Sequence, residues 1–87
     1  MGYSYLTEKA EIFTEDGQVM FLRIRDHARK LLEVSGAVTG GKLLAAGGTG
    51  SSWTMMACVD RLCELGELRK VYDGSWWQHS VYVAVEK

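Results

Sequence analysis

The chain has 87 residues, of which 47% are hydrophobic and 24% are charged, and its formal net charge at pH 7 is −1. This length and balance are typical of one folded domain with a modest core, and they exclude a disordered tail. No apolar run approaches the roughly 20 residues that a membrane-spanning helix needs. Residues Met1–Thr7 lack the basic start and apolar middle of a secretion signal. We therefore expect a cytoplasmic protein without a membrane partner.

Residues 1–17 form an N-terminal arm whose structure the sequence leaves open, and residues 18–87 form the folded domain. In the arm, Thr7 could cap a single helical turn that runs through Phe13. Asp16-Gly17 could instead be the tight turn of a hairpin, because Asp-Gly suits the backbone angles of such turns. A third arrangement is an extended arm that lies on the domain or joins two copies of the chain. Its apolar residues would be Tyr3, Tyr5 and Leu6.

The first strong helical pattern begins near Gln18 and ends at Ser35-Gly36. Apolar residues recur there at spacings of three and four, which places them on one face of a helix. Glycine is the usual residue where a helix ends in a left-handed turn. The predicted apolar stripe consists of Met20, Phe21, Ile24, Ala28, Leu31 and Leu32.

Short elements follow this helix. Residues 37–39 are apolar or β-branched and could form a small strand, and Thr39 can cap a short helix over residues 40–46. The glycine-rich segment 47–50 then predicts a turn.

The next segment, residues 51–65, predicts a longer helix. Either Ser51 or Ser52 can cap its start, and Gly66 follows its end. Its apolar stripe is Met55, Val59 and Leu62, with Cys58 as a small core residue and Cys63 at the edge of the core.

The C-terminal residues predict a hairpin. Residues 68–72 alternate as a strand does, Asp73-Gly74 is a strong turn pair, and residues 80–85 form a second strand. Trp76 and Trp77 are neighbours, so in a strand one ring would point toward the core and the other outward.

A short helix, a tight turn, a longer helix and a hairpin, in this order, resemble the winged helix-turn-helix family. The resemblance covers about residues 20–85. It implies an α+β fold of three helices with a C-terminal β-wing of two or three strands. In that family the helix corresponding to residues 51–65 enters the major groove of DNA, and residues 68–85 would be the wing. The matching packing positions are Leu43, Leu44, Met55, Val59, Leu62, Leu65, Gly66 and Leu68.

The function that this resemblance implies first is duplex-DNA binding by a transcriptional regulator. The local chemistry fits it incompletely. Arg61 is the one residue of the predicted recognition helix that commonly reads base edges, while Asp60 and Glu64 would repel phosphates. The candidate nucleic-acid contacts are Lys42, Ser51, Ser52, Trp53, Thr54, Arg61, Arg69 and Lys70.

The alternative function is a protein-binding winged helix, acting as an adaptor or inhibitor of the small phage-encoded kind. It is favoured by the near-neutral charge and by aromatic residues, which are common anchors of protein interfaces. The candidate contacts are Trp53, Met56, Tyr72, Trp76, Trp77 and His79.

Catalysis and cofactor binding have little support. No nucleophile or acid–base pair is placed beside His27 or His79 by a recognisable motif, and the two histidines and two cysteines do not have metal-ligand spacing. Residues 36–43 read GxxxxGK-L, which lacks the Ser or Thr that a phosphate-binding loop needs after its lysine. We therefore expect no enzyme activity, no metal and no cofactor.

Overall fold

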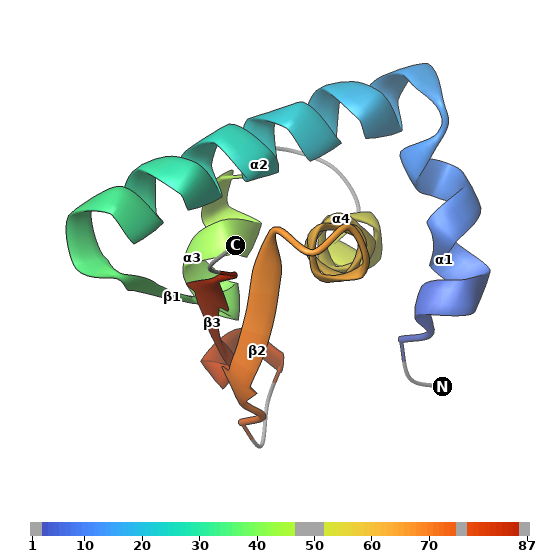
Figure 1. The fold of residues 1–87 in the computed structure, drawn as a ribbon. Coiled ribbons are helices and arrows are strands. Elements are labelled where there is room, and N and C mark those ends of the chain that lie inside the picture. The colour runs from blue at the N-terminus through green and yellow to red at the C-terminus, as the bar shows by residue number, and fades with distance from the viewer. Residues whose placement is uncertain (1–2, 47–51, 75–76, 86–87) are drawn as a thin grey trace.

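The computed structural model describes residues 3–46, 52–74 and 77–85, with the backbone alone at residue 77. Within these residues the chain forms four α-helices and a three-stranded antiparallel sheet (Figure 1), an α+β layout that is compatible with a winged helix. None of the described helices is long and apolar enough to cross a membrane. The elements are α1 (Tyr5–Ile12), α2 (Glu15–Ser35), β1 (Ala37–Thr39), α3 (Gly40–Ala46), α4 (Ser52–Glu64), β2 (Leu68–Tyr72), the short 3-10 helix η1 (Trp77–His79) and β3 (Val81–Ala84).

The N-terminal arm is helical, so the helical arrangement considered for it is confirmed in part, and the hairpin and the extended arm are wrong. It forms α1, which begins at Tyr5 without a cap from Thr7, and α2 begins at Glu15, three residues earlier than expected. Thr14 forms the corner between these helices: its hydroxyl accepts the N–H of Gly17 at 3.0 Å and donates to the Glu11 carbonyl at 2.8 Å. This capping satisfies backbone groups that a helix start leaves open, so the corner is sharp and needs no hairpin.

Position 17 requires glycine for a reason other than the turn predicted there. It lies in the first turn of α2, and a Cβ built there would be 1.9 Å from the carbonyl oxygen of Glu11. The end of α1 therefore approaches the backbone of α2 more closely than any side chain would permit. Glycine at this position allows the two helices to meet.

The sheet has the order β1-β3-β2, so β1 adds a third strand beside β3. Val38 is paired with Tyr82 and Leu68 with Ala84, and a bulge interrupts β2 between Lys70 and Tyr72. The chain before β3 is a 3-10 turn instead of a strand. The alternation expected for the neighbouring tryptophans therefore does not apply to residue 77, and Trp76 lies outside the described residues.

The core lies where α2 and α4 cover one face of the sheet. The predicted stripes of both helices are confirmed, since their central residues are buried and Cys63 is half-buried at the edge. After α4, Gly66 has φ +80°, its N–H donates to the Cys63 carbonyl, and the Glu67 N–H donates to the Leu62 carbonyl at 2.9 Å. This Schellman end turns the chain into β2. The buried hydrophobic residues are Ile12, Ile24, Ala28, Val38, Leu43, Met55, Ala57, Cys58, Val59, Leu62, Leu68 and Tyr82.

Candidate interaction surface on helix α4

Helix α4 lies between the sheet and α1, so both of its sides have a neighbour (Figure 1). Its inward face follows from the spacing of Met55, Val59 and Leu62, which are at most 5% exposed. In the family that the sequence resembles, the opposite face is open. Here α1 packs along that face, and this contact defines the candidate site.

Polar bonds hold α1 on the outer face of α4. The Tyr3 hydroxyl donates to Asp60 Oδ2 at 2.5 Å. Glu64 accepts from the Tyr5 hydroxyl at 3.1 Å and pairs with Lys9 at 3.1 Å. The contact also has an apolar part: Ile12 is buried, and the partly buried Tyr3 and Tyr5 pack against the core.

Arg61, the residue expected to read bases, forms contacts with other residues of the same chain. It forms an ion pair with Glu64, and its guanidinium lies 5.6 Å from the centre of the Phe13 ring. An arginine over an aromatic face gains a cation–π attraction. To reach a base, Arg61 would have to leave both partners.

The outer face of α4 is partly covered. Ala57 has no exposed surface and Asp60 is half-buried, whereas Trp53 in the first turn is 40% exposed. The outer face of α4 is therefore open at Trp53 and Glu64 and covered in between. Tyr3, which precedes α1, contributes to this cover through its bond to Asp60.

The electrostatics reflect these contacts. Burial raises the pKa of Asp60 above its usual range, while the Tyr3 hydrogen bond and the charge of Lys70 act in the opposite direction. The bonds from Arg61 and then Lys9 lower the pKa of Glu64. Burial, together with the hydrogen bond to Glu64, raises the pKa of Tyr5 to about 12. Both carboxylates are thus engaged within the chain.

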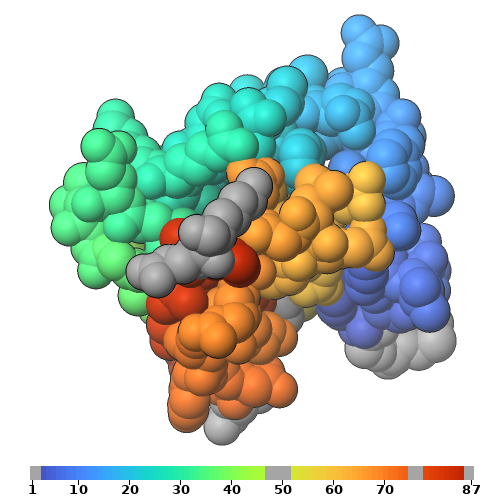
Figure 2. All heavy atoms as spheres, viewed as in Figure 1, coloured from blue at the N-terminus to red at the C-terminus, as the bar shows by residue number. Residues whose placement is uncertain are grey.

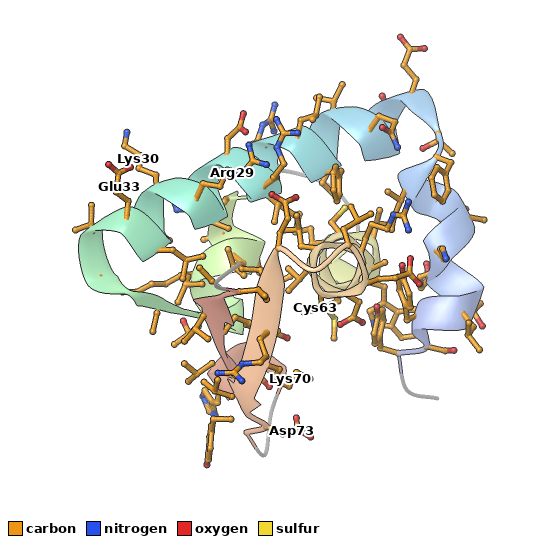
Figure 3. All side chains as sticks on the ribbon, in the orientation of Figure 1. Arg29, Lys30, Glu33, Cys63, Lys70 and Asp73 are labelled. Carbon is orange, nitrogen blue, oxygen red and sulfur yellow. The ribbon has the colours of Figure 1, made fainter. Side chains whose placement is uncertain are left out.

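A recess lies between the N-terminal part of α1 and the β2–β3 hairpin, both of which project past α4 (Figure 2). Trp53, Met56, Asp60 and Cys63 are spaced by three, four and three residues, so they share one face of α4. Figure 3 shows Cys63 on the side of α4 between α1 and β2, with Lys70 on β2. Burial is the main reason that the pKa of Cys63 is raised to about 11, while the charge of Asp60 raises it further and that of Lys70 lowers it. We call this region the α4 recess.

The other nucleic-acid candidates are distributed over three elements. Lys42 on α3, Ser52 on α4 and Arg69 on β2 are exposed, and Thr54 is half-buried. Lys70 is 3.6 Å from Asp73 and lies 5.8 Å from the centre of the Tyr82 ring. Ser51 lies outside the described residues.

The protein-contact candidates are partly brought together. Trp53 and the half-buried Met56 lie on the recess side of α4. Tyr72, 59% exposed, and the exposed His79 belong to the hairpin. The side chains of residues 76 and 77 lie outside the described part.

Tyr3, Lys9 and Cys63 were not predicted as site residues from the sequence. The first two lie in the segment that was treated as an arm, and Cys63 was considered only as a residue at the core edge. The spacing of Tyr5, Lys9 and Ile12 fits one face of a short helix and could have indicated the helix in this segment.

Comparison of the chain with models of known protein families, with curated proteins and with solved structures finds no match in any of them. The likeness to winged helices therefore rests on the order of the elements and on the packing positions described above.

Proposed function

We propose that this chain is a protein-binding domain with a winged-helix layout that receives a segment of a partner protein in the α4 recess. The observation that carries the proposal is the position of α1, which occupies the outer face of α4 through Tyr3, Tyr5 and Lys9. With the hairpin on its other side, α4 is set back between two projecting elements (Figure 2).

This shape suits a partner segment better than a DNA groove. A helix that reads bases must project, because it enters a major groove about 12 Å wide and about 8.5 Å deep. On this side of the molecule α1 projects and α4 does not. Arg61 is also bound to Glu64 and Phe13. The acidic residues of α4 would also face phosphates if α1 were absent.

The chemistry of the recess supports the same proposal. Its floor combines an indole, a thioether and a thiol from Trp53, Met56 and Cys63. Tryptophan and methionine are enriched in the cores of protein interfaces, and tryptophan is a frequent hot spot.

The experiment is affinity capture from a lysate of the source cells, in which the wild-type chain is compared with three variants. Trp53→Ala should lose a protein that the wild type retains, by at least about tenfold, as expected for a hot spot of more than 1.4 kcal/mol. Val34→Ala, 80% exposed on α2, is the surface control and should retain it.

Val59→Ala controls for stability. Val59 is fully buried in the core, so its truncation should lower the thermal midpoint without changing the recess. All chains are compared below their midpoints. A protein retained by Val59→Ala and lost by Trp53→Ala supports the proposal. Equal retention by all four chains contradicts it.

A second candidate is duplex-DNA binding by a transcriptional regulator, favoured by the exposure of Lys42, Ser52 and Arg69. These side chains could contact phosphates while α4 stays covered. Binding would then weaken steeply with salt and decrease in Lys42→Ala and Arg69→Ala. A salt-independent response would exclude this candidate.

A further inference from the structure

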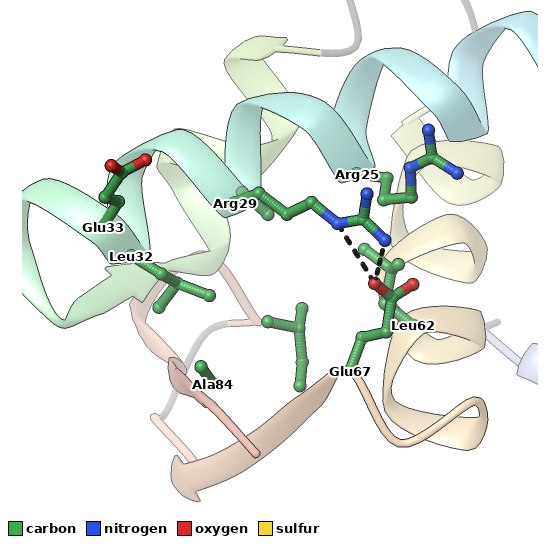
Figure 4. A pocket seen from close by; sticks show the side chains of 9 residues that line it. Arg25, Arg29, Leu32, Glu33, Leu62, Glu67 and Ala84 are labelled. Carbon is green, nitrogen blue, oxygen red and sulfur yellow. Dashed lines mark hydrogen bonds and ion pairs between the residues drawn. The ribbon is translucent and has the colours of Figure 1, made fainter. Parts of the chain in front are cut away.

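A separate cavity of about 280 Å³ opens between α2, the end of α4 and the sheet (Figure 4). It shares no residue with the α4 recess. Its residues come from the middle of α2, the α4–β2 corner and the end of β3. The lining consists of Arg25, Ala28, Arg29, Leu32, Glu33, Leu62, Glu67, Leu68 and Ala84.

The floor of this cavity is apolar and fixed. Ala28, Leu62 and Leu68 are at most 3% exposed, so they are held by the core. An apolar cavity of about 150 Å³ holds a benzene molecule in an engineered protein and excludes water. The present cavity is nearly twice that size, which is enough for a two-ring aromatic group. Filling it would restore dispersion contacts that its lining lacks.

The mouth is crossed by one ion pair. Arg29 donates from Nε at 3.2 Å and from Nη2 at 2.5 Å, both to Oε1 of Glu67. In Figure 4 this pair lies over the cavity, whereas the carboxylate of Glu33 points away from it. The guanidinium of Arg25 is engaged by Asp26 at 3.1 Å.

The Arg29–Glu67 pair indicates the polar group that a ligand would need. Both groups are on the surface, with 59% of the Arg29 side chain exposed, so the pair can open at little cost. A guanidinium binds carboxylates through two parallel N–H donors, and Glu67 uses one of its oxygens for both. Glu67 thus occupies the place that the carboxylate of a ligand would take.

We infer that this cavity binds a small carboxylate with an apolar body, whose body lies on Leu62 and Leu68 and whose carboxylate replaces Glu67 on Arg29. The site is independent of the proposed partner-binding function. Its ligand class is an aromatic or branched aliphatic acid.

The test uses naphthalene carboxylate and two matched probes, the corresponding alcohol and amine. Methyl NMR spectra of the wild-type chain should show shifts of Leu32, Leu62 and Leu68 on addition of the carboxylate. The alcohol and the amine should bind about tenfold more weakly, which corresponds to the loss of one charge-assisted hydrogen bond. Unshifted leucine methyl signals, or equal affinities for the three probes, would overturn the inference.

Substitutions of the two partners of the ion pair should change the affinity for the carboxylate probe in opposite directions. Arg29→Gln should weaken binding of the carboxylate about tenfold, to the affinity of the alcohol. Glu67→Gln should strengthen it severalfold, because the competing carboxylate is gone. Lys30→Gln, on the same helix but outside the lining, is the matched control and should leave affinity unchanged.

A purely structural ion pair would give a different result. Both substitutions would then change affinity in the same direction, and this outcome would contradict the inference. Ala84→Phe should block all three probes, because Ala84 is exposed at the end of β3 and lines the cavity. Retained binding in a folded Ala84→Phe chain would equally contradict it.

Discussion

The hydrogen bond between Tyr3 and Asp60 makes the position of α1 measurable. Tyr3→Phe removes the hydroxyl that lies 2.5 Å from Asp60 Oδ2 and leaves a half-buried carboxylate without this donor. Hydrogen bonds to charged groups contribute about 1.5–3 kcal/mol. Water can replace part of this bond because the pair is partly exposed, so we expect a loss of about 1–2 kcal/mol. In a domain of this size, such a loss lowers the thermal midpoint by about 5–12 °C.

Tyr5→Phe is the matched control for Tyr3→Phe. It removes an exposed bond to Glu64, and Glu64 keeps its contacts with Lys9 and Arg61. We therefore expect a change within about 0.5 kcal/mol. Urea and thermal unfolding measure both variants. Carboxyl NMR titration should also show a further rise in the pKa of Asp60 in Tyr3→Phe, since this bond holds the value down. Equal stability losses and an unchanged Asp60 titration would refute the docking of α1 described here.

Other predictions concern the helix corner, pH and thiol chemistry. Gly17→Ala should destabilise the chain by about 1–3 kcal/mol, because its Cβ would meet the Glu11 carbonyl at 1.9 Å; a neutral result in urea unfolding would show that the corner can relax. Since the pKa of Glu64 is lowered on folding, its contribution to stability is present above its unfolded pKa of about 4.3 and is lost as pH falls through the folded value. Unfolding of Glu64→Gln should therefore depend less on pH in that acidic range than unfolding of the wild type, and parallel curves would contradict this. Burial raises the pKa of both Cys58 and Cys63 to about 11, so alkylation by iodoacetamide near neutral pH should be slow until the chain unfolds, and rapid labelling of native Cys63 would be inconsistent with its placement.

Much of the fold could be predicted because the patterns that produce it are local. The stripe of Met55, Val59 and Leu62 follows helical spacing, and Gly66 ends the helix with a positive φ. The two strands of the hairpin were predicted from local patterns, but the tight turn expected at Asp73-Gly74 was wrong, because the connection runs on through η1 to Val81. These features depend on near neighbours in the sequence, which pattern analysis captures well.

The N-terminal segment could not be predicted because its structure depends on tertiary contacts. α1 has eight residues, a length at which an isolated helix is marginal in water. Its partners on α4, Asp60 and Glu64, lie 57 and 59 residues from Tyr3 and Tyr5. Asp16-Gly17 has the composition of a turn, but the Thr14 cap and the close approach of Glu11 place it inside α2.

Part of the candidate site could not be predicted either, because it also depends on tertiary contacts. Trp53 and Met56 were identified as contacts from their expected outward positions. The burial of Ala57 and the contacts of Arg61 with Glu64 and Phe13 depend on tertiary packing, which sequence spacing alone does not show.

The central claim is that α1 covers the outer face of α4 and prevents it from reading DNA. The most direct test is fluorescence polarisation with random-sequence duplex DNA at about 50 mM and about 200 mM salt, for the wild type and for Arg61→Ala. The two chains should not differ, whether or not Lys42 and Arg69 give weak, salt-sensitive binding. Tight binding that falls steeply with salt and is lost in Arg61→Ala would contradict this claim, because Arg61 would then read DNA instead of contacting Glu64 and Phe13.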